Sequence, residues 1–419
     1  MTPFEPIISF AQQMDSLDEL AGFKEAFHFP QHDGRDVIYF CGNSLGLQPR
    51  NVEAAIQQEL ESWKTLGVEG YFHGPNPWLY YHDYVTEPLA KLVGAQKQEV
   101  TVMNTLTVNL HLLMLSFYKP SGKRYKIMME AGAFPSDQYA VETLLLHYGY
   151  NPGEAIIEVT PRENEKLLRD EDILQAIAEH GEHLALVLFG GINYYTGQLF
   201  NMAAITAAAH QVGAIAGFDL AHVTGNVPVQ LHDWNVDFAV WCSYKYLNAG
   251  PGAIGGLFVH ERHAVNTATP RLGGWWGNDE KTRFKMEKGF RPKASAGGWN
   301  ISTAQVFNTV ALKASLELFE KAGIDKLRNK SINLTKYLSF LLQHLANLDF
   351  EIITPPEPGR RGAQLCLYFK QQGRVVHDKL TANGIVADYR EPGVIRVAPA
   401  PLYCSFEDCY RFYEIVKTI

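Results

Sequence analysis

Short apolar runs alternate with longer amphipathic segments between residues 125 and 241. We predict strands at Tyr125–Glu130, Ala155–Val159, Leu184–Phe189, Ala214–Asp219 and Phe238–Trp241, and helices at Ser136–Leu146, Asp170–Glu179 and Met202–Gln211. Strands that are joined through helices lie parallel, because the crossover returns the chain to the same edge of the sheet. The alternation therefore predicts an α/β fold in which helices cover both faces of a mostly parallel sheet.

Polar side chains and glycines follow directly after these apolar runs. They lie at 134–137 (FPSD), at 190–195 (GGINYY), at Asp219 and at Lys245. Because the carboxyl ends of parallel strands meet at one edge of the sheet, where ligands bind, we expect these residues to converge on one site. The 26 residues from Asp219 to Lys245 fit one crossover between neighbouring strands.

Lys245 stands in an unusual context for a lysine. A buried-strand pattern ends at Trp241, Lys245 follows between two tyrosines, and a Gly/Pro-rich segment comes next. Most lysines are solvated surface charges. A lysine just past a buried strand, beside glycines that let the backbone approach a ligand, suits an amine that forms a Schiff base.

The block SYKYLNAGPGAIGG at 243–256 closely resembles the lysine segment of kynureninases. These enzymes use pyridoxal 5′-phosphate (PLP) and are similar in fold to the aspartate-aminotransferase superfamily, fold type I. Similar blocks run through most of the chain, among them CGNSLGLQP at 41–49, NTLTVNLHLL at 104–113, GFDLAH at 217–222 and IRVAPAPLY at 395–403. The resemblance implies a large domain, with a sheet of the seven-stranded type between helices, and a smaller α+β C-terminal domain.

We divide the chain into an N-terminal arm at 1–45, a large PLP-binding domain at 46–300 and a small C-terminal domain at 301–419. The arm has a helical pattern near Ser16–Glu25, and a helix is predicted at Asn51–Leu66. The C-terminal domain is expected to contain helices at Ser302–Lys321 and Ile324–Leu345 and strands at Gln364–Lys370, Gly384–Asp388 and Val394–Val397.

The resemblance also implies which residues hold the cofactor. Lys245 would form the Schiff base, and Asp219 would keep the pyridine nitrogen protonated, so that the ring can accept electrons from the substrate. Leu106 and Thr107, at the start of a helix, would bind the phosphate. The remaining implied contacts are Phe134 stacked on the ring, Pro135, Ser136, Asp137 and His222 around it, Tyr195 and Tyr244 at the phosphate, and Trp275 and Thr303 reaching across the interface of a homodimer.

Three residues are implied for the substrate: Ser44, Tyr71 near its aromatic ring, and Arg396, which would hold the α-carboxylate bidentately. Tyr195 would also act as a general acid. The implied reaction is hydrolysis of the Cβ–Cγ bond of L-kynurenine or 3-hydroxy-L-kynurenine, in tryptophan degradation and NAD biosynthesis. Two departures from relatives bear on the site, because Gly190 stands where many kynureninases have serine and Thr303 where some have asparagine.

Composition limits the partners. A net charge of −8 without a dense Lys/Arg tract argues against nucleic acid. The sequence contains no run of 18 or more apolar residues, so we expect no membrane span, and the N-terminus lacks the pattern of a signal peptide. The five cysteines form no CxxC pair, so we expect no disulfide and no metal site, and a cytoplasmic location fits.

Two other functions stay open at this point. The first is another PLP enzyme of the superfamily, a cysteine desulfurase or an aminotransferase. A desulfurase needs a mobile cysteine near the site, whereas Cys242 stands at the end of a predicted buried strand. The second is a non-catalytic binding protein with the same fold, against which the presence of Lys245, Asp219 and Arg396 argues.

Overall fold

The computed structural model describes residues 3–345 and 348–418. Its centre is a seven-stranded sheet with the order β4-β10-β9-β8-β7-β5-β6. The strands are β4 (Val100–Val102), β5 (Lys126–Glu130), β6 (Ile156–Val159), β7 (Leu184–Gly190), β8 (Ile215–Asp219), β9 (Phe238–Cys242) and β10 (Gly255–Val259). In the described chain β10 pairs antiparallel with both neighbours, while β6, β5, β7, β8 and β9 pair in parallel. The α/β prediction and its five strands are confirmed to within two residues.

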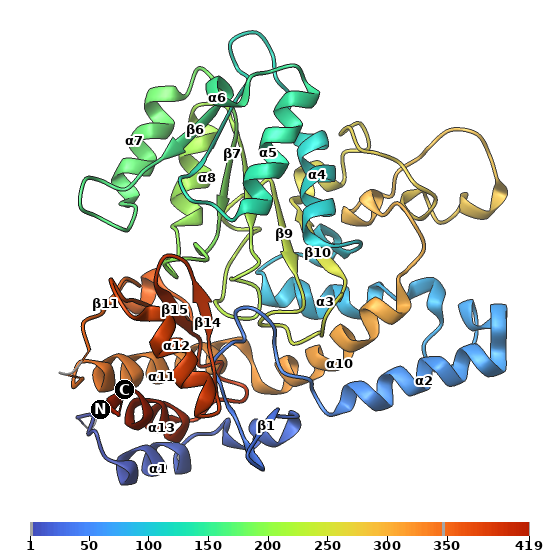
Figure 1. Cartoon of the computed structure of the whole chain (residues 1–419). Coiled ribbons are helices and arrows are strands. Elements are labelled where there is room, and N and C mark those ends of the chain that lie inside the picture. The colour runs from blue at the N-terminus through green and yellow to red at the C-terminus, as the bar shows by residue number, and fades with distance from the viewer. Residues whose placement is uncertain (1–2, 346–347, 419) are drawn as a thin grey trace.

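Helices cover both faces of this sheet (Figure 1). On one side are α4 (Leu106–Phe117) and α5 (Pro135–His147); on the other are α7 (Asp170–His180) and α8 (Met202–Gln211). The alternation of side chains along β9 shows why both faces need cover: Phe238 and Val240 are buried against α4 and α5, whereas Ala239 and Trp241 are buried in the opposite core.

The C-terminal part combines helices with a second, antiparallel sheet. The helices are α10 (Val306–Ala322), α11 (Ile324–Leu342), α12 (Gly373–Ala382) and α13 (Phe406–Lys417). The sheet has the order β11 (Glu351–Ile352), β12 (Leu365–Tyr368), β15 (Val394–Val397) and β14 (Asp388–Arg390). The strand predicted at Gly384–Asp388 is divided between β13 (Ile385–Val386) and β14. The domain boundaries at 45 and 300 stay a prediction.

The N-terminal arm packs on this C-terminal part. Strand β3 (Ile38–Tyr39) pairs in parallel with β13, and both chain ends lie beside α1 (Ile8–Ser16) and α13 (Figure 1). The helix predicted near Ser16–Glu25 is wrong, because α1 ends at Ser16 and only a 3₁₀ helix, Ala21–Ala26, follows. Asp18 accepts the Leu20 N–H at 2.9 Å, and such a side-chain turn competes with helix continuation.

Shorter elements complete the described chain. They are α3 (Asp83–Leu92), α6 (Pro152–Ala155), α9 (Glu261–Ala264), the hairpin β1 (Gln31–His32) and β2 (Arg35–Asp36), and 3₁₀ helices at Gly67–Tyr71, Trp78–Tyr80, Lys97–Glu99, Trp275–Gly277, Arg283–Lys285, Ala296–Trp299 and Pro358–Arg360. None of the helices in this part of the chain combines the length and the apolar character needed to cross a bilayer.

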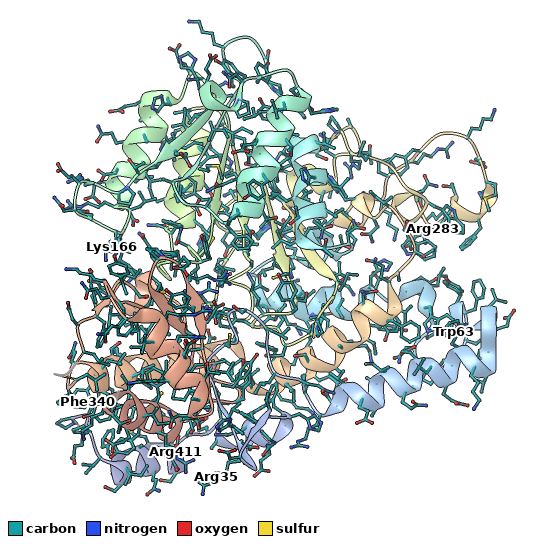
Figure 2. All side chains as sticks on the ribbon, viewed as in Figure 1. Arg35, Trp63, Lys166, Arg283, Phe340 and Arg411 are labelled. Atoms are coloured by element: carbon teal, nitrogen blue, oxygen red, sulfur yellow. The ribbon has the colours of Figure 1, made fainter. Side chains whose placement is uncertain are left out.

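Helix α2 (Asn51–Leu66) and the loop between α9 and α10 project from the same side of the molecule (Figure 1). Figure 2 labels Trp63 on α2 and Arg283 on the loop. The apolar face of α2 is only partly covered, since Val52 is buried but Leu60 is 40% exposed and Trp63 is 59% exposed. The projecting side therefore offers apolar surface to a partner.

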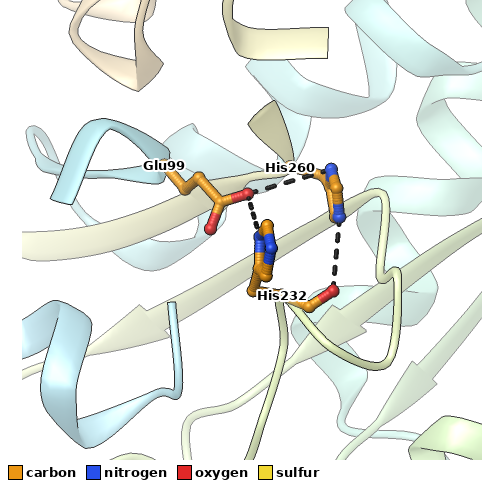
Figure 3. A group of neighbouring side chains, drawn as sticks. All are labelled: Glu99, His232 and His260. Carbon is orange, nitrogen blue, oxygen red and sulfur yellow. Dashed lines mark hydrogen bonds and ion pairs between the residues drawn. The ribbon is translucent and has the colours of Figure 1, made fainter. Parts of the chain in front are cut away.

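Glu99, His232 and His260 form a hydrogen-bonded cluster at the amino ends of the parallel strands (Figure 3). Their ligand atoms lie within 4.8 Å of one another, as in a metal site. Glu99 is already engaged, because it accepts from His232 Nδ1 at 2.9 Å and from the N–H groups of Glu261 and Gln96 at 2.7 and 2.8 Å. We therefore interpret the cluster as a structural contact that joins three segments, at the edge of the sheet opposite the carboxyl ends of the parallel strands.

Candidate active site

A cavity lies at the carboxyl ends of the parallel strands, as predicted. Its wall is formed by the ends of β5, β7 and β8, the first turns of α4 and α5, and the turn after β9. Its lining residues are Leu106, Thr107, Glu130, Phe134, Ser136, Asp137, Gly190, Ile192, Tyr194, Asp219, Ala221, His222, Tyr244 and Lys245. Sequence positions more than 130 residues apart thus meet in one place, because parallel strands carry their ends to the same edge.

Lys245 projects into this cavity from the turn after β9. Its Nζ lies 3.1 Å from His222 Nε2 and 5.8 Å from the centroid of the Phe134 ring. Burial, followed by the charge of Lys245, lowers the pKa of His222 well below its usual value. The neutral His222 ring therefore accepts a hydrogen bond from the Lys245 ammonium, which holds the amine over the site.

Asp219 and Asp137 form a buried carboxyl pair on the cavity floor. Asp219 Oδ1 accepts the Ala221 N–H at 2.6 Å, which fixes the carboxyl at the end of β8. Burial and the neighbouring Asp219 raise the pKa of Asp137 well above its usual value, so Asp137 keeps its proton and donates a hydrogen bond to Asp219. Asp137 Oδ1 has no hydrogen-bond partner among the described residues. A protonated pyridine nitrogen would supply the missing positive charge at this floor.

The first turn of α4 forms the opposite end of the cavity. Its N-cap residue, Thr105, makes no side-chain cap, and Leu106 and Thr107 face the cavity. Thr107 Oγ1 lies 2.7 Å from Ser136 Oγ, so two hydroxyls meet beside the helix start. Backbone N–H groups, the helix dipole and these hydroxyls together suit a phosphate.

Phe134 stands between these two ends. It precedes Pro135, the first residue of α5, and its ring is 42% exposed. Tyr194 packs edge-to-face against it, with ring centroids 5.1 Å apart. A large ring left exposed on a cavity wall suits stacking with an aromatic ligand. The cavity therefore fits PLP: Asp219 can face the ring nitrogen, Phe134 can stack on the ring, Lys245 offers an amine, and the start of α4 can hold the phosphate.

Arg396 and Ser44 come together at the border of the site. Arg396 is buried on β15, where Nη1 donates to the Tyr194 carbonyl at 2.8 Å and Nη2 to Ser44 Oγ at 3.2 Å. Both side chains also bond to Asp388, which sequence reasoning missed. Burial opposes ionisation of Asp388, but Arg396 and Ser44 outweigh it and lower its pKa. Asp388 and Arg396 lie directly opposite each other in the antiparallel strands β14 and β15. An acidic and a basic residue eight positions apart, on two strands joined by a turn, were the sequence signal that could have indicated this ion pair.

Seven predicted site residues are absent from the cavity lining of this chain: Pro135 at the start of α5, Ser44 and Arg396 at the border, and Tyr71, Tyr195, Trp275 and Thr303. Tyr195 packs with Ile353, Cys366 and Val394, whereas its neighbour Tyr194, which sequence reasoning passed over, lines the cavity. Tyr71 packs edge-on against Trp78, Trp275 packs against Trp276 and Phe284, and Thr303 lies just before α10. The functional roles of all predicted site residues stay predictions.

Known proteins match this arrangement. Solved structures with this fold include the cysteine desulfurase CsdA from Escherichia coli, with a TM-score of 0.77, 17% identity and coverage of 96% of this chain and 98% of that one. A C-DES mutant with glycine covalently linked to the PLP cofactor matches with a TM-score of 0.75 and 15% identity, over 91% of this chain and 96% of that one. These likenesses show that the chain has the fold of PLP enzymes of fold type I, and the residues of the cavity suit that cofactor.

Sequence relatives narrow the class. Residues 327–416 match the family model described as the kynureninase C-terminal domain. A kynureninase from Myxococcus xanthus is 55% identical over 417 residues, which cover 99% of this chain and 97% of the relative. The chain belongs to the kynureninase family. The likeness to the desulfurases, with less than 20% sequence identity, is one of fold alone. As a member of the kynureninase family, the enzyme uses PLP.

Proposed function

We propose that the enzyme hydrolyses the Cβ–Cγ bond of L-kynurenine, releasing anthranilate and L-alanine. The observation that carries this proposal is the convergence of Lys245, Asp219, Phe134 and the start of α4 on one cavity, with Arg396 and Ser44 at its border. PLP, when bound, supplies an electron sink for the substrate's α-carbon. The sequence relatives support the reaction through their shared family.

In this proposal Lys245 has two tasks, which are to tether the cofactor and to move protons. Once the substrate amine takes its place, the free Nζ removes the α-proton, and His222 accepts from Nζ so that the amine stays oriented. Asp219 remains the anion that faces the ring nitrogen. Tyr195 remains the predicted general acid for the alanine moiety, although it packs beside the cavity and its hydroxyl would have to turn towards the substrate. Burial raises its pKa to about 12, which favours a protonated hydroxyl at neutral pH.

Arg396 would bind the substrate α-carboxylate. Its Nε has no hydrogen-bond partner among the described residues, although the side chain is buried. A buried donor without a partner is costly, and a substrate carboxylate would satisfy it. Asp388 and the Tyr194 carbonyl hold the rest of the guanidinium, which orients the free N–H before substrate arrives.

We also propose a homodimer whose sites are completed across the interface. The projecting side exposes Trp63, Phe72, Trp275 and Phe284, each by 45% or more. Contiguous exposed aromatic surface is typical of protein interfaces. The predicted residues Tyr71, Trp275 and Thr303 stand apart from their own chain's cavity, which supports a role in the partner's site. A cytoplasmic location stays our prediction; the five free cysteines fit it.

Mixed dimers test the shared sites. Subunits carrying Lys245→Ala are co-expressed, under separate affinity tags, with subunits carrying Trp275→Ala and Thr303→Ala. If Trp275 and Thr303 serve the partner, each mixed dimer contains one site without any change. A statistical mixture of C2 dimers then recovers about a quarter of wild-type activity. Each homodimeric variant alone is the control and stays nearly inactive. A mixture that recovers nothing would place these residues in their own subunit's site.

Substrate choice is expected to favour kynurenine over 3-hydroxykynurenine. An unpaired ring hydroxyl inside an apolar pocket costs about 1–3 kcal/mol. Thr303 is shorter than the asparagine of some relatives and carries a hydroxyl in place of an amide, and Tyr71 is expected to fill space beside the ring. We therefore expect Thr303→Asn to narrow the difference in kcat/KM between the two substrates, with Thr303→Val as the matched control that does not. A wild type that prefers the hydroxylated substrate by about tenfold or more contradicts this interpretation of the pocket.

A further inference from the structure

Strand β5 ends in Glu130, a carboxyl group on the cavity floor that the proposed mechanism does not use. Only 3% of the residue is exposed. Its two oxygens lie 3.1 and 3.2 Å from the Gly190 nitrogen, so the carboxyl accepts the N–H at the end of β7. A Cβ on residue 190 would lie 2.9 Å from Glu130 Oε1. Glycine at position 190 thus leaves room for the Glu130 carboxyl.

The contact with Gly190 links Glu130 to Asp219. Gly190 is the register partner of Asp219 in the neighbouring strand, and the Gly191 N–H donates to the Asp219 carbonyl at 2.7 Å. The end of β7 is therefore held between the Glu130 carboxyl group on one side and the backbone carbonyl of Asp219 on the other. A change in the charge or size of the Glu130 side chain therefore acts on the backbone of Gly190 and Gly191, which lies next to Asp219.

The charges that face Glu130 make its ionisation unfavourable. The anion is Asp219 from β8, the cation on the described cavity wall is Lys245 after β9, and the nearby Asp137 from α5 is protonated. His222 is neutral there. Burial, and then the charge of Asp219, raise the pKa of Glu130 to about 8. The raised pKa favours the protonated form of the Glu130 carboxyl group at neutral pH.

We propose that Glu130 is a positioning residue of the cofactor site, which acts as a neutral carboxylic acid. It holds Gly190 and fills the floor beside Asp219 without adding a second negative charge next to the ring nitrogen. Asp219 then remains the anion that pairs with the ring. The proposal rests on the assignment of this cavity to PLP, which the proposed function shares.

Infrared spectroscopy of the wild type tests the protonation directly. Protein labelled with ¹³C in the glutamate side-chain carboxyl is examined at pH 7, where exposed glutamates are ionised. We expect one C=O stretching band of a protonated carboxyl group, which disappears as the pH rises past about 8 and is missing in Glu130→Gln. A labelled protein that shows no such band at pH 7, or a Glu130→Gln variant that keeps it, overturns the proposal.

Cofactor spectra test the positioning role. Glutamine keeps the size and neutrality of the protonated acid, so Glu130→Gln is expected to retain PLP at pH 7 with unchanged absorbance. The wild-type absorbance of bound PLP should show an inflection near pH 8 that Glu130→Gln lacks. The control is Glu158→Gln, an exposed carboxylate on the adjacent β6, which should behave like the wild type. A folded Glu130→Gln that loses PLP, or that keeps the inflection, contradicts the proposal.

These outcomes separate the two proposals. A wild-type protein that binds no PLP contradicts the proposed function. PLP bound normally, with Glu130 ionised at pH 7 in the infrared spectrum, contradicts the role of Glu130 alone. The infrared measurement on the wild type also decides the question if Glu130→Gln does not fold.

Discussion

Replacing Lys245 with alanine is expected to abolish turnover of L-kynurenine. Lys245 is the lysine that lines the cavity in the described part of the chain. In the proposed mechanism both the covalent tether and the proton transfer at the α-carbon depend on its amine. Loss of a group that serves as nucleophile and base costs on the order of 10⁴-fold or more in kcat, by analogy with other catalytic nucleophiles. Steady-state kinetics on protein reconstituted with PLP measures the loss.

Mass spectrometry identifies the same lysine independently of activity. Borohydride reduction of the wild-type holoenzyme should leave the cofactor on the peptide that contains Lys245, and the alanine variant should give no labelled peptide. Lys123→Ala is a suitable control, because this side chain is 78% exposed and distant from the cavity lining. Label on another lysine would show that the assignment is wrong.

Asp219→Asn is expected to bind PLP and to lose most of its activity. The amide preserves the shape and the bond from the Ala221 N–H, but it cannot hold the positive charge of the ring nitrogen. Truncating one partner of a buried, hydrogen-bonded charge pair costs about 2–5 kcal/mol, which corresponds to roughly 30- to 5,000-fold in kcat. Kinetics together with PLP titration separate the loss of catalysis from the loss of cofactor.

Asp33→Asn is the matched control for this change. Asp33 is 91% exposed, and its backbone has a φ of 49°, a conformation that asparagine also adopts. This variant should keep wild-type kinetics. Near-normal turnover in Asp219→Asn would mean that another anion serves the ring nitrogen, and Asp137, its hydrogen-bonded neighbour, would be the first to examine.

Local sequence patterns were sufficient for the framework of the site. The apolar runs at 125–130, 155–159, 184–189, 214–219 and 238–241 became parallel strands, since strand and helix periodicities are local properties of the chain. Polar residues that follow such strands must meet at one edge, and this placed Phe134, Asp219 and Lys245 around one cavity. Recognition of the blocks around these residues then supplied the family.

Other features of the site depend on side chains that meet across elements. Gly190 was recognised as a departure, but only the approach of Glu130 from β5 shows what occupies the adjacent space. Similarly, Tyr194 and not Tyr195 faces the cavity, because the direction of a side chain in the turn after β7 follows from packing against Phe134 and not from composition. Neither local propensity nor spacing contains this information.

The sequence by itself determined the fold class, the edge of the sheet that carries the candidate site and the lysine that lies there, because these follow from periodicity and from residue types at strand ends. Only the tertiary structure decided the ionic partner of Arg396, the burial of Glu130 beside Gly190 and the exposure of Trp63 on α2. Each of these depends on distances and burial between segments far apart in the chain, and electrostatic and hydrophobic energies are functions of those distances.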